Sequence, residues 1–115
     1  MSVVLTSLRE LTEEYVKKFS DKDLGGIAKM LHQDFVLEDP VVKRVEGKYH
    51  SLKAIEKLFK NEKLSFSAKN VFVDGETSII EFELLLGDSN LKGVDIIQWK
   101  DGKMQELRAY LDIPK

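Results

Sequence analysis

The sequence predicts a single α+β domain in which three helices precede a run of antiparallel strands. Its 115 residues suit one domain. Apolar residues recur with helical spacing in the first half of the chain, whereas turn-forming pairs such as Asp101-Gly102 divide the second half into strands. Because each helix has one apolar stripe that needs a partner, we expect the helices to cover one face of the sheet.

The first helix is expected over residues 4–20. Its apolar stripe consists of Val4, Leu8, Leu11, Tyr15 and Phe19. The second helix should begin at a cap formed by Ser20 or Asp21. Its apolar face consists of Leu24, Ile27, Ala28 and Leu31. A short strand over residues 35–39 and a loop over 41–50 then lead to a third helix, at about residues 51–60.

Four strands are expected in the second half of the chain, over residues 66–73, 77–86, 91–100 and 103–112. Turns at residues 74–76, 87–90 and 101–102 separate them, and each turn contains a glycine. Strands joined by short turns pair as hairpins, so these four should form an antiparallel sheet.

Strand alternation places two carboxyl groups on apolar faces. Asp39 shares one face of its strand with two apolar residues, and Asp95 shares a face with Ile97 and Trp99. Apolar surroundings disfavour the ionised form of a carboxyl group, so the pKa of Asp95 should be raised. Tyr15 lies on the stripe of the first helix, so its hydroxyl should also point inward.

Three inward polar groups from three elements indicate one pocket. A carboxylate base, a phenol and a neutral carboxylic acid suit proton abstraction next to a carbonyl, because the two donors stabilise the charge that develops on the oxygen. Each group also has a structural alternative. The structural interpretation makes Tyr15 a core residue and Asp39 a turn cap before Pro40, whereas Asp95 inside an apolar strand is harder to explain that way.

The composition argues against several other classes of function. The chain has no cysteine, which excludes disulfides, cysteine–zinc sites and a cysteine nucleophile. Its net charge of −2 provides no basic face for nucleic acid, and its two histidines lack metal-ligand spacing. Residues 1–10 lack the basic start and long apolar stretch typical of a signal peptide, and no apolar run approaches the roughly 20 residues that span a membrane. We therefore expect a cytoplasmic protein without metal or cofactor.

Two segments resemble bacterial ketosteroid isomerases. Residues 14–40 combine an inward tyrosine, a helix and a strand that ends in Glu-Asp-Pro, and residues 94–110 form a hairpin with an aspartate near its start. The resemblance spans nearly the whole chain and extends to the nuclear-transport-factor-2-like superfamily, which includes SnoaL-type polyketide cyclases. It implies a cystatin-like cone, in which a curved antiparallel or mixed sheet wraps around the three helices and encloses a pocket.

The resemblance also implies roles for individual residues. Asp39 would be the base that shuttles a proton, while Tyr15 and a protonated Asp95 would bind the oxyanion. Leu31 and Phe59 stand where some members of the family have tyrosines that support the catalytic one, and Leu111 replaces an aromatic residue. The apolar residues expected to contact the ligand are Leu31, Phe59, Ile97, Trp99, Leu107 and Leu111.

These observations favour a small-molecule-binding protein that acts, if it is an enzyme, as a cofactor-independent isomerase or cyclase on a small apolar or cyclic carbonyl ligand. The alternatives are a non-catalytic module that holds an apolar ligand or peptide, and a purely structural dimerisation domain. The strand over residues 91–100 is apolar on both faces at its centre, so its outer face needs a cover. We therefore expect a homodimer through the outer face of the sheet, as the resemblance also implies.

Overall fold

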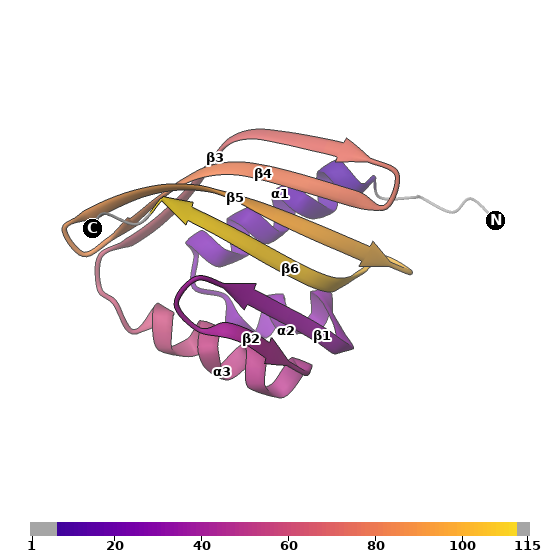
Figure 1. The fold of residues 1–115 in the computed structure, drawn as a ribbon, viewed down its shortest axis with the longest axis horizontal. Helices are drawn as coiled ribbons and strands as arrows, with labels where there is room; N and C mark the ends of the chain where they lie inside the picture. Colours follow the sequence, from indigo (N-terminus) through magenta and orange to yellow (C-terminus); the bar gives the residue numbers. More distant parts are fainter. Residues whose placement is uncertain (1–6, 113–115) are drawn as a thin grey trace.

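The computed structural model describes residues 7–112, which form three helices and a six-stranded sheet (Figure 1). The elements are, in chain order, α1 (Leu8–Ser20), α2 (Leu24–Met30), β1 (Leu31–Asp39), β2 (Lys43–Glu46), α3 (Lys48–Phe59), β3 (Leu64–Asp74), β4 (Thr77–Leu86), β5 (Ser89–Lys100) and β6 (Lys103–Asp112). The predicted α+β class, with helices leading and strands following, is confirmed.

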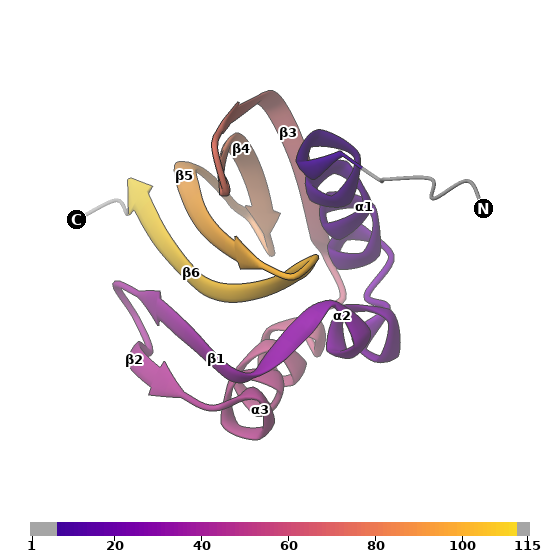
Figure 2. The same cartoon turned by 90° about the vertical axis from the view of Figure 1, so that its right-hand side faces the viewer.

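The sheet is mixed, with the strand order β2-β1-β6-β5-β4-β3. Its neighbouring strands are antiparallel except for β1 and β6, which run parallel and so join the first half of the chain to the last strand. Figure 2 shows that the sheet curves strongly, with α1 against β3 and β4 and with α3 beside β1. The curved, mixed sheet around three helices is the predicted architecture.

The start of α1 is set by a capping box. The Ser7 hydroxyl accepts from the Glu10 amide, and the Glu10 carboxylate accepts from the Ser7 amide. The helix thus begins at Leu8 rather than at Val4, and Val4 itself lies outside the described residues.

The predicted start of α2 is wrong. Lys22 has a φ of +56°, which ends the helical path after α1. The Asp23 carboxylate then caps α2 by accepting a hydrogen bond from the Gly26 amide at 2.9 Å. Leu31 therefore leaves the helix and becomes the first residue of β1.

The residues that form strand β2 were predicted to lie in a loop over residues 41–50. The strand has one partly buried apolar residue, Val45, among exposed polar ones, so its sequence carries no strand pattern. It forms because the chain turns sharply at Lys43, with φ of +65°, and pairs back along β1. Helix α3 then begins at Lys48, about one turn before the predicted start at residue 51. The residue before it, Gly47, has a φ of +94°, which favours glycine.

The four later strands follow the prediction closely. Strands β4 and β6 have the expected bounds, whereas β3 and β5 each start two residues earlier than predicted. Strand β5 does so because the turn before it needs only Gly87 and Asp88. Burial alternates along β4, which confirms that one face of the sheet points inward. Within residues 7–112, no helix has both the length and the apolarity to cross a membrane.

A glycine on the inner face of β5 allows three strands to pack closely. Gly93 pairs with Phe82 of β4 and Leu111 of β6. A Cβ atom on Gly93 would lie 2.5 Å from the Tyr110 carbonyl oxygen and 2.8 Å from Cζ of Phe82. These distances are far below van der Waals contact, so the phenyl ring of Phe82 occupies the space that a side chain at residue 93 would need.

We expect Gly93→Ala to lower the free energy of unfolding by about 1–3 kcal/mol, because it overpacks the inner face. Urea unfolding monitored by Trp99 fluorescence measures the change. Gly25→Ala in α2 is the matched control, since the nearest atom to its new methyl group is 4.0 Å away. That variant should instead gain up to about 1 kcal/mol in helix propensity. Equal effects of the two substitutions would contradict the packing argument.

Candidate functional site

A cavity of about 290 Å³ lies between the helices and the inner face of the sheet. This volume is at the low end of the range of about 300–1,000 Å³ that is usual for small-molecule sites. Tyr15, Asp39 and Asp95 all line it, and every other side chain in its wall is apolar. The structure thus brings the three polar residues singled out in the sequence to one apolar cavity.

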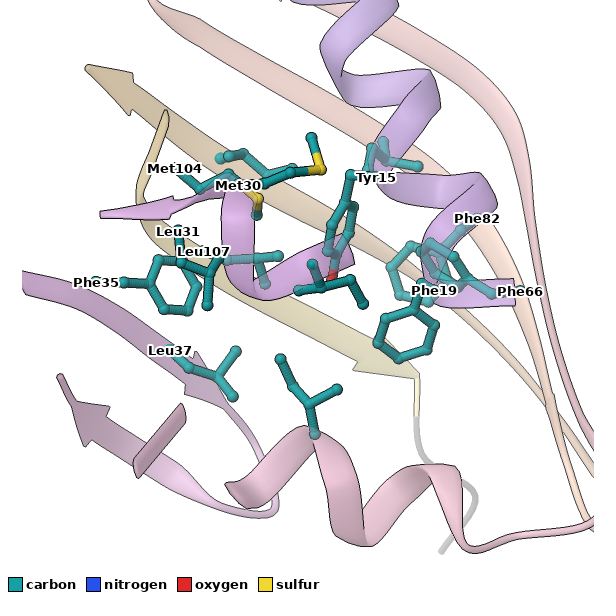
Figure 3. Close-up of a cluster of buried hydrophobic side chains, with 14 of the residues drawn as sticks. Tyr15, Phe19, Met30, Leu31, Phe35, Leu37, Phe66, Phe82, Met104 and Leu107 are labelled. Carbon is teal, nitrogen blue, oxygen red and sulfur yellow. The ribbon is translucent and has the colours of Figure 1, made fainter. Parts of the chain in front are cut away.

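Tyr15 enters the cavity from the middle of α1. Only 4% of the residue is exposed, and its ring packs against Phe19 and Phe66 at centroid distances of 5.9 and 6.4 Å. The hydroxyl points away from the helix, into the cluster of buried side chains (Figure 3). Burial, and secondarily the charge of Asp95, raise the pKa of Tyr15 well above its ordinary value, so the phenol remains a hydrogen-bond donor.

Asp95 lies on the inner face of β5 and is also only 4% exposed. Its neighbours across the sheet are Ile80 on β4 and Ala109 on β6, neither of which offers a polar side chain. Burial, reinforced by the negative charge of Asp39, raises the pKa of Asp95 from 3.8 to about 8. At neutral pH the group is therefore mainly a neutral carboxylic acid that can donate a hydrogen bond.

Asp39 ends β1 at the rim of the cavity and is half-buried. Its Oδ1 accepts hydrogen bonds from the backbone amides of Val41 and Val42, at 2.7 and 2.6 Å. Asp39 thus both caps the turn after β1 and lines the cavity. Arg108, on the neighbouring strand, forms its ion pair with Glu106 at 2.5 Å.

The sheet register explains why Asp39 and Asp95 point into the same cavity. Glu38 pairs with Arg108, so the next residues in this parallel ladder, Asp39 and Ala109, are also neighbours. Ala109 in turn pairs with Asp95. The two aspartates are therefore separated by two strand spacings, about 10 Å. The small side chain of Ala109 leaves the space between them open.

The apolar residues predicted to contact a ligand fall into two groups. Leu31, Leu107 and Leu111 line the cavity, whereas Phe59, Ile97 and Trp99 do not. Phe59 packs edge-on against Phe19, with ring centroids 5.1 Å apart. Ile97 and Trp99 do face inward, as predicted, but they lie further along β5, in the solid core.

Several cavity residues escaped the sequence analysis. Phe66 and Phe82 contribute rings from β3 and β4, with centroids 4.9 Å apart, and strand alternation alone could have placed them inside. Val41 and Val42 form part of the rim although both are exposed. No sequence pattern indicated them, because their position depends on the turn that Asp39 caps.

Comparison with known proteins identifies the family. Residues 12–107 match the model of the SnoaL-like domain. The chain belongs to the SnoaL-like domain family. Because this match covers most of the chain, it confirms the predicted resemblance to SnoaL-type proteins. No curated protein matches the chain.

Solved structures similar to this SnoaL-like domain support the fold. A Xanthomonas campestris protein of unknown function with a cystatin-like fold has a TM-score of 0.86 at 16% identity, over 94% of this chain and 92% of its own. A Kribbella flavida protein proposed to be a ketosteroid isomerase has a TM-score of 0.80 at 21% identity, over 93% of this chain and 78% of its own. A Jannaschia protein proposed to be a SnoaL-like polyketide cyclase has a TM-score of 0.77 at 16% identity, over 96% of this chain and 92% of its own. The identities are low, so these structures establish the cystatin-like fold alone.

Among residues 7–112, no three histidine or acidic side chains are close enough together to hold an ion. The polar side chains that line the cavity are those of Tyr15, Asp39 and Asp95.

The burial of Asp95 predicts a specific dependence of stability on pH. Between pH 3.8 and about 8 the folded protein holds one proton on Asp95 that the unfolded chain has released. The free energy of unfolding contributed by this group is therefore complete below pH 3.8 and is lost as pH rises through this window, by about 1.4 kcal/mol per pH unit. Asp95→Asn should remove that slope, so the variant gains stability relative to wild type as pH increases.

Urea unfolding of both proteins from pH 4 to pH 9 measures this difference, and carboxyl ¹³C NMR measures the pKa directly. Asp34→Asn is the matched control, because Asp34 is exposed on β1 and its substitution should leave the pH profile unchanged. Parallel profiles of wild type and Asp95→Asn would contradict a raised pKa at Asp95.

Proposed function

We propose that this SnoaL-like domain transfers a proton at a carbon next to a carbonyl group, as a cofactor-independent isomerase or cyclase of a small apolar or cyclic carbonyl compound. The observation that carries the proposal is Asp95, a carboxylic acid buried beside Tyr15 in a cavity that is otherwise apolar. The proposed activities of the similar Kribbella and Jannaschia proteins are of this kind.

In the proposed reaction Asp39 removes the proton α to the carbonyl. The electron pair of the broken C–H bond moves into the enolate, and negative charge develops on the oxygen. Tyr15 and protonated Asp95 donate hydrogen bonds to that oxygen, in a cavity where such bonds are strong because water is excluded. Protonated Asp39 then returns the proton to another carbon of the enolate, which restores the carboxylate.

The geometry favours this division of roles between the two aspartates. Asp39 is half-buried and anchored through Oδ1, which leaves Oδ2 without a hydrogen bond to any described residue. Asp95 is almost fully buried, and its neutral form is favoured by the charge on Asp39. Two carboxyl groups in unlike environments can serve as base and as hydrogen-bond donor at the same pH.

The apolar wall limits the ligands that suit the site. None of the residues that line the cavity is cationic, and two are carboxyl groups, so an anionic ligand would be repelled. A neutral ligand with one carbonyl oxygen would satisfy both buried donors and fill the apolar remainder.

Exchange of α-protons in D₂O tests the proposal without knowledge of the natural substrate. Cyclic enones and polyketide-like ketones should incorporate deuterium in the presence of the protein, as measured by ¹H NMR. Asp39→Asn should slow the exchange by about 10²–10⁴-fold, because it removes the base. The amide oxygen of the variant can still cap the turn at Val41 and Val42, so the cavity should be preserved.

Glu38→Gln is the matched control for this experiment. Glu38 precedes Asp39 on β1 and lies on the opposite face, where it is within 4.0 Å of Arg44. The control should exchange protons at the wild-type rate. Equal loss in both variants, or exchange that persists in Asp39→Asn, would argue against Asp39 as the base.

A second candidate function is non-catalytic binding of an apolar ligand. It is favoured by the surroundings of Tyr15, whose ring is held by aromatic contacts with Phe19 and Phe66 in place of the supporting tyrosines that the resemblance implied. Under this alternative the same compounds shift the NMR signals of the cavity residues, while neither wild type nor Asp39→Asn exchanges their α-protons.

We also infer that two copies pair through the outer face of the sheet. An apolar row crosses three strands there, since Phe72 of β3 pairs with Ile79 of β4, which pairs with Ile96 of β5. Phe72 is 53% exposed, and Tyr110, on β6 at the other side of the same face, is 56% exposed. An exposed apolar row of this kind is typical of a surface that another protein covers.

Light scattering after size-exclusion chromatography should give twice the chain mass of 13.2 kDa. Phe72→Lys should produce monomers, because a charge at the β3 end of the apolar row cannot be buried in the interface without a partner. Tyr49→Lys is the control, since Tyr49 is more exposed, at 67%, but lies on α3 away from the sheet face. A monomeric wild-type protein would refute the pairing.

A further inference from the structure

A chain of buried hydrogen bonds crosses the core between α1 and the sheet. It consists of Thr12 on α1, Ser78 on β4 and Trp99 on β5, with exposed fractions of 0%, 0% and 3%. Trp99 Nε1 lies 2.8 Å from Ser78 Oγ, and Ser78 Oγ lies 2.8 Å from Thr12 Oγ1. Thr12 Oγ1 lies in turn 2.6 Å from the carbonyl oxygen of Leu8.

One assignment of the protons satisfies all of these groups. The indole N–H can only donate, so Ser78 Oγ accepts from Trp99. The Thr12 hydroxyl has one proton, and its short contact with the Leu8 carbonyl oxygen indicates that it donates its hydrogen bond there. The Ser78 proton is then the one that lies between Ser78 and Thr12. Each donor has one acceptor, and the chain ends on the backbone of α1.

This chain connects the two elements that carry the buried donors of the cavity. Thr12 lies three residues before Tyr15, which puts both on the buried face of α1, whereas Glu13 and Glu14 between them are exposed. Trp99 lies four residues after Asp95, on the same inward face of β5. The hydrogen bonds therefore join α1 about one turn from Tyr15 to the strand that holds Asp95.

Apolar contacts alone do not fix a helix on a sheet as closely. A helix that lies on side chains of similar size can rotate or slide by a fraction of an ångström at little cost, since the packing interactions are not directional. A hydrogen bond has a narrow range of length and angle, and a buried donor that loses its acceptor is strongly disfavoured. The hydrogen bonds from Trp99 through Ser78 and Thr12 to Leu8 can all form only within a narrow range of placements of α1.

We propose that Thr12, Ser78 and Trp99 are positioning residues, which hold α1 on the sheet so that the Tyr15 hydroxyl and the Asp95 carboxyl meet the same ligand oxygen. This inference rests on the proposed function, since it concerns the two donors of the proton-transfer site. None of the three residues lines the cavity, so they act through Tyr15 and Asp95 rather than on the ligand.

A purely structural role would also explain three buried polar side chains, because their loss would destabilise the fold. The two roles differ in what happens at Asp95. If the chain fixes α1, its loss lets α1 move and water approach the carboxyl group, which faces Tyr15 from α1, Asp39 from β1 and apolar side chains elsewhere. If it contributes stability alone, the surroundings of Asp95 in the folded protein stay unchanged.

The test is the pKa of Asp95, measured by carboxyl ¹³C NMR in Thr12→Val, Ser78→Ala and Trp99→Phe. Thr12→Val and Ser78→Ala each remove two of the three hydrogen bonds and keep the size of the side chain nearly constant, whereas Trp99→Phe removes only the bond to Ser78 and leaves a smaller ring. The pKa of Asp95 should fall from about 8 by at least about one unit toward its ordinary value, a tenfold change in proton affinity. The ¹³Cζ signal of Tyr15, which should follow the titration of Asp95 in wild type, should follow it less.

Two further variants separate positioning from stability. Thr12→Ser keeps the hydroxyl and should retain the wild-type pKa at Asp95. Ile27→Val is the matched control for stability, because Ile27 is fully buried on α2 and lies outside both the chain and the cavity wall. It should lower the unfolding temperature without a change at Asp95.

Each outcome supports or overturns the inference. Wild-type pKa values at Asp95 in Thr12→Val, Ser78→Ala and Trp99→Phe would overturn the positioning role while the proposed function stands. An ordinary pKa at Asp95 in wild type would overturn both, because no neutral donor would remain to be positioned. If Ser78→Ala does not fold, Thr12→Val with its Thr12→Ser counterpart and the milder Trp99→Phe still decide between the two roles.

Discussion

A carboxyl group cannot stay ionised in an apolar interior without a cost of several kcal/mol, and this constraint governs the site around Asp95. Strand alternation forces the residue inward, between the apolar side chain of Ile80 and the methyl group of Ala109. No described side chain compensates its charge, and the nearest charged group of the cavity, Asp39, has the same sign. The neutral acid is the form that the fold accommodates, and a neutral acid is a donor.

The parallel pairing of β1 with β6 brings the base to this donor. It aligns the end of β1 with Ala109, so that Asp39 and Asp95 lie on one row of the sheet with only a small side chain between them. The turn after β1 holds Asp39 in place, since the amides of Val41 and Val42 bind its Oδ1. The same turn places two valines at the rim, so one local structure orients the carboxylate and shapes the entrance.

The sequence was sufficient to predict which side chains point inward, because period-two and period-3.6 patterns record that directly. Tyr15, Asp39 and Asp95 were placed correctly in this respect. The patterns do not record how far along an element the cavity extends, which is why Ile97 and Trp99 were expected in its wall but lie in the solid core. Strand β2 was not predictable either, because its pairing follows from a turn at Lys43 rather than from an apolar pattern.

The support of Tyr15 distinguishes this chain from the pattern that the resemblance implied. Where tyrosines on neighbouring helices would hold the hydroxyl, this chain has Leu31 at the start of β1 and Phe59 against Phe19. The phenol ring is held by aromatic contacts, and the hydroxyl is free to turn toward a ligand. Its position is then only as precise as that of α1 itself. A directional tie between α1 and the sheet, such as the one through Thr12 and Ser78, can supply the precision that the missing hydroxyl groups do not.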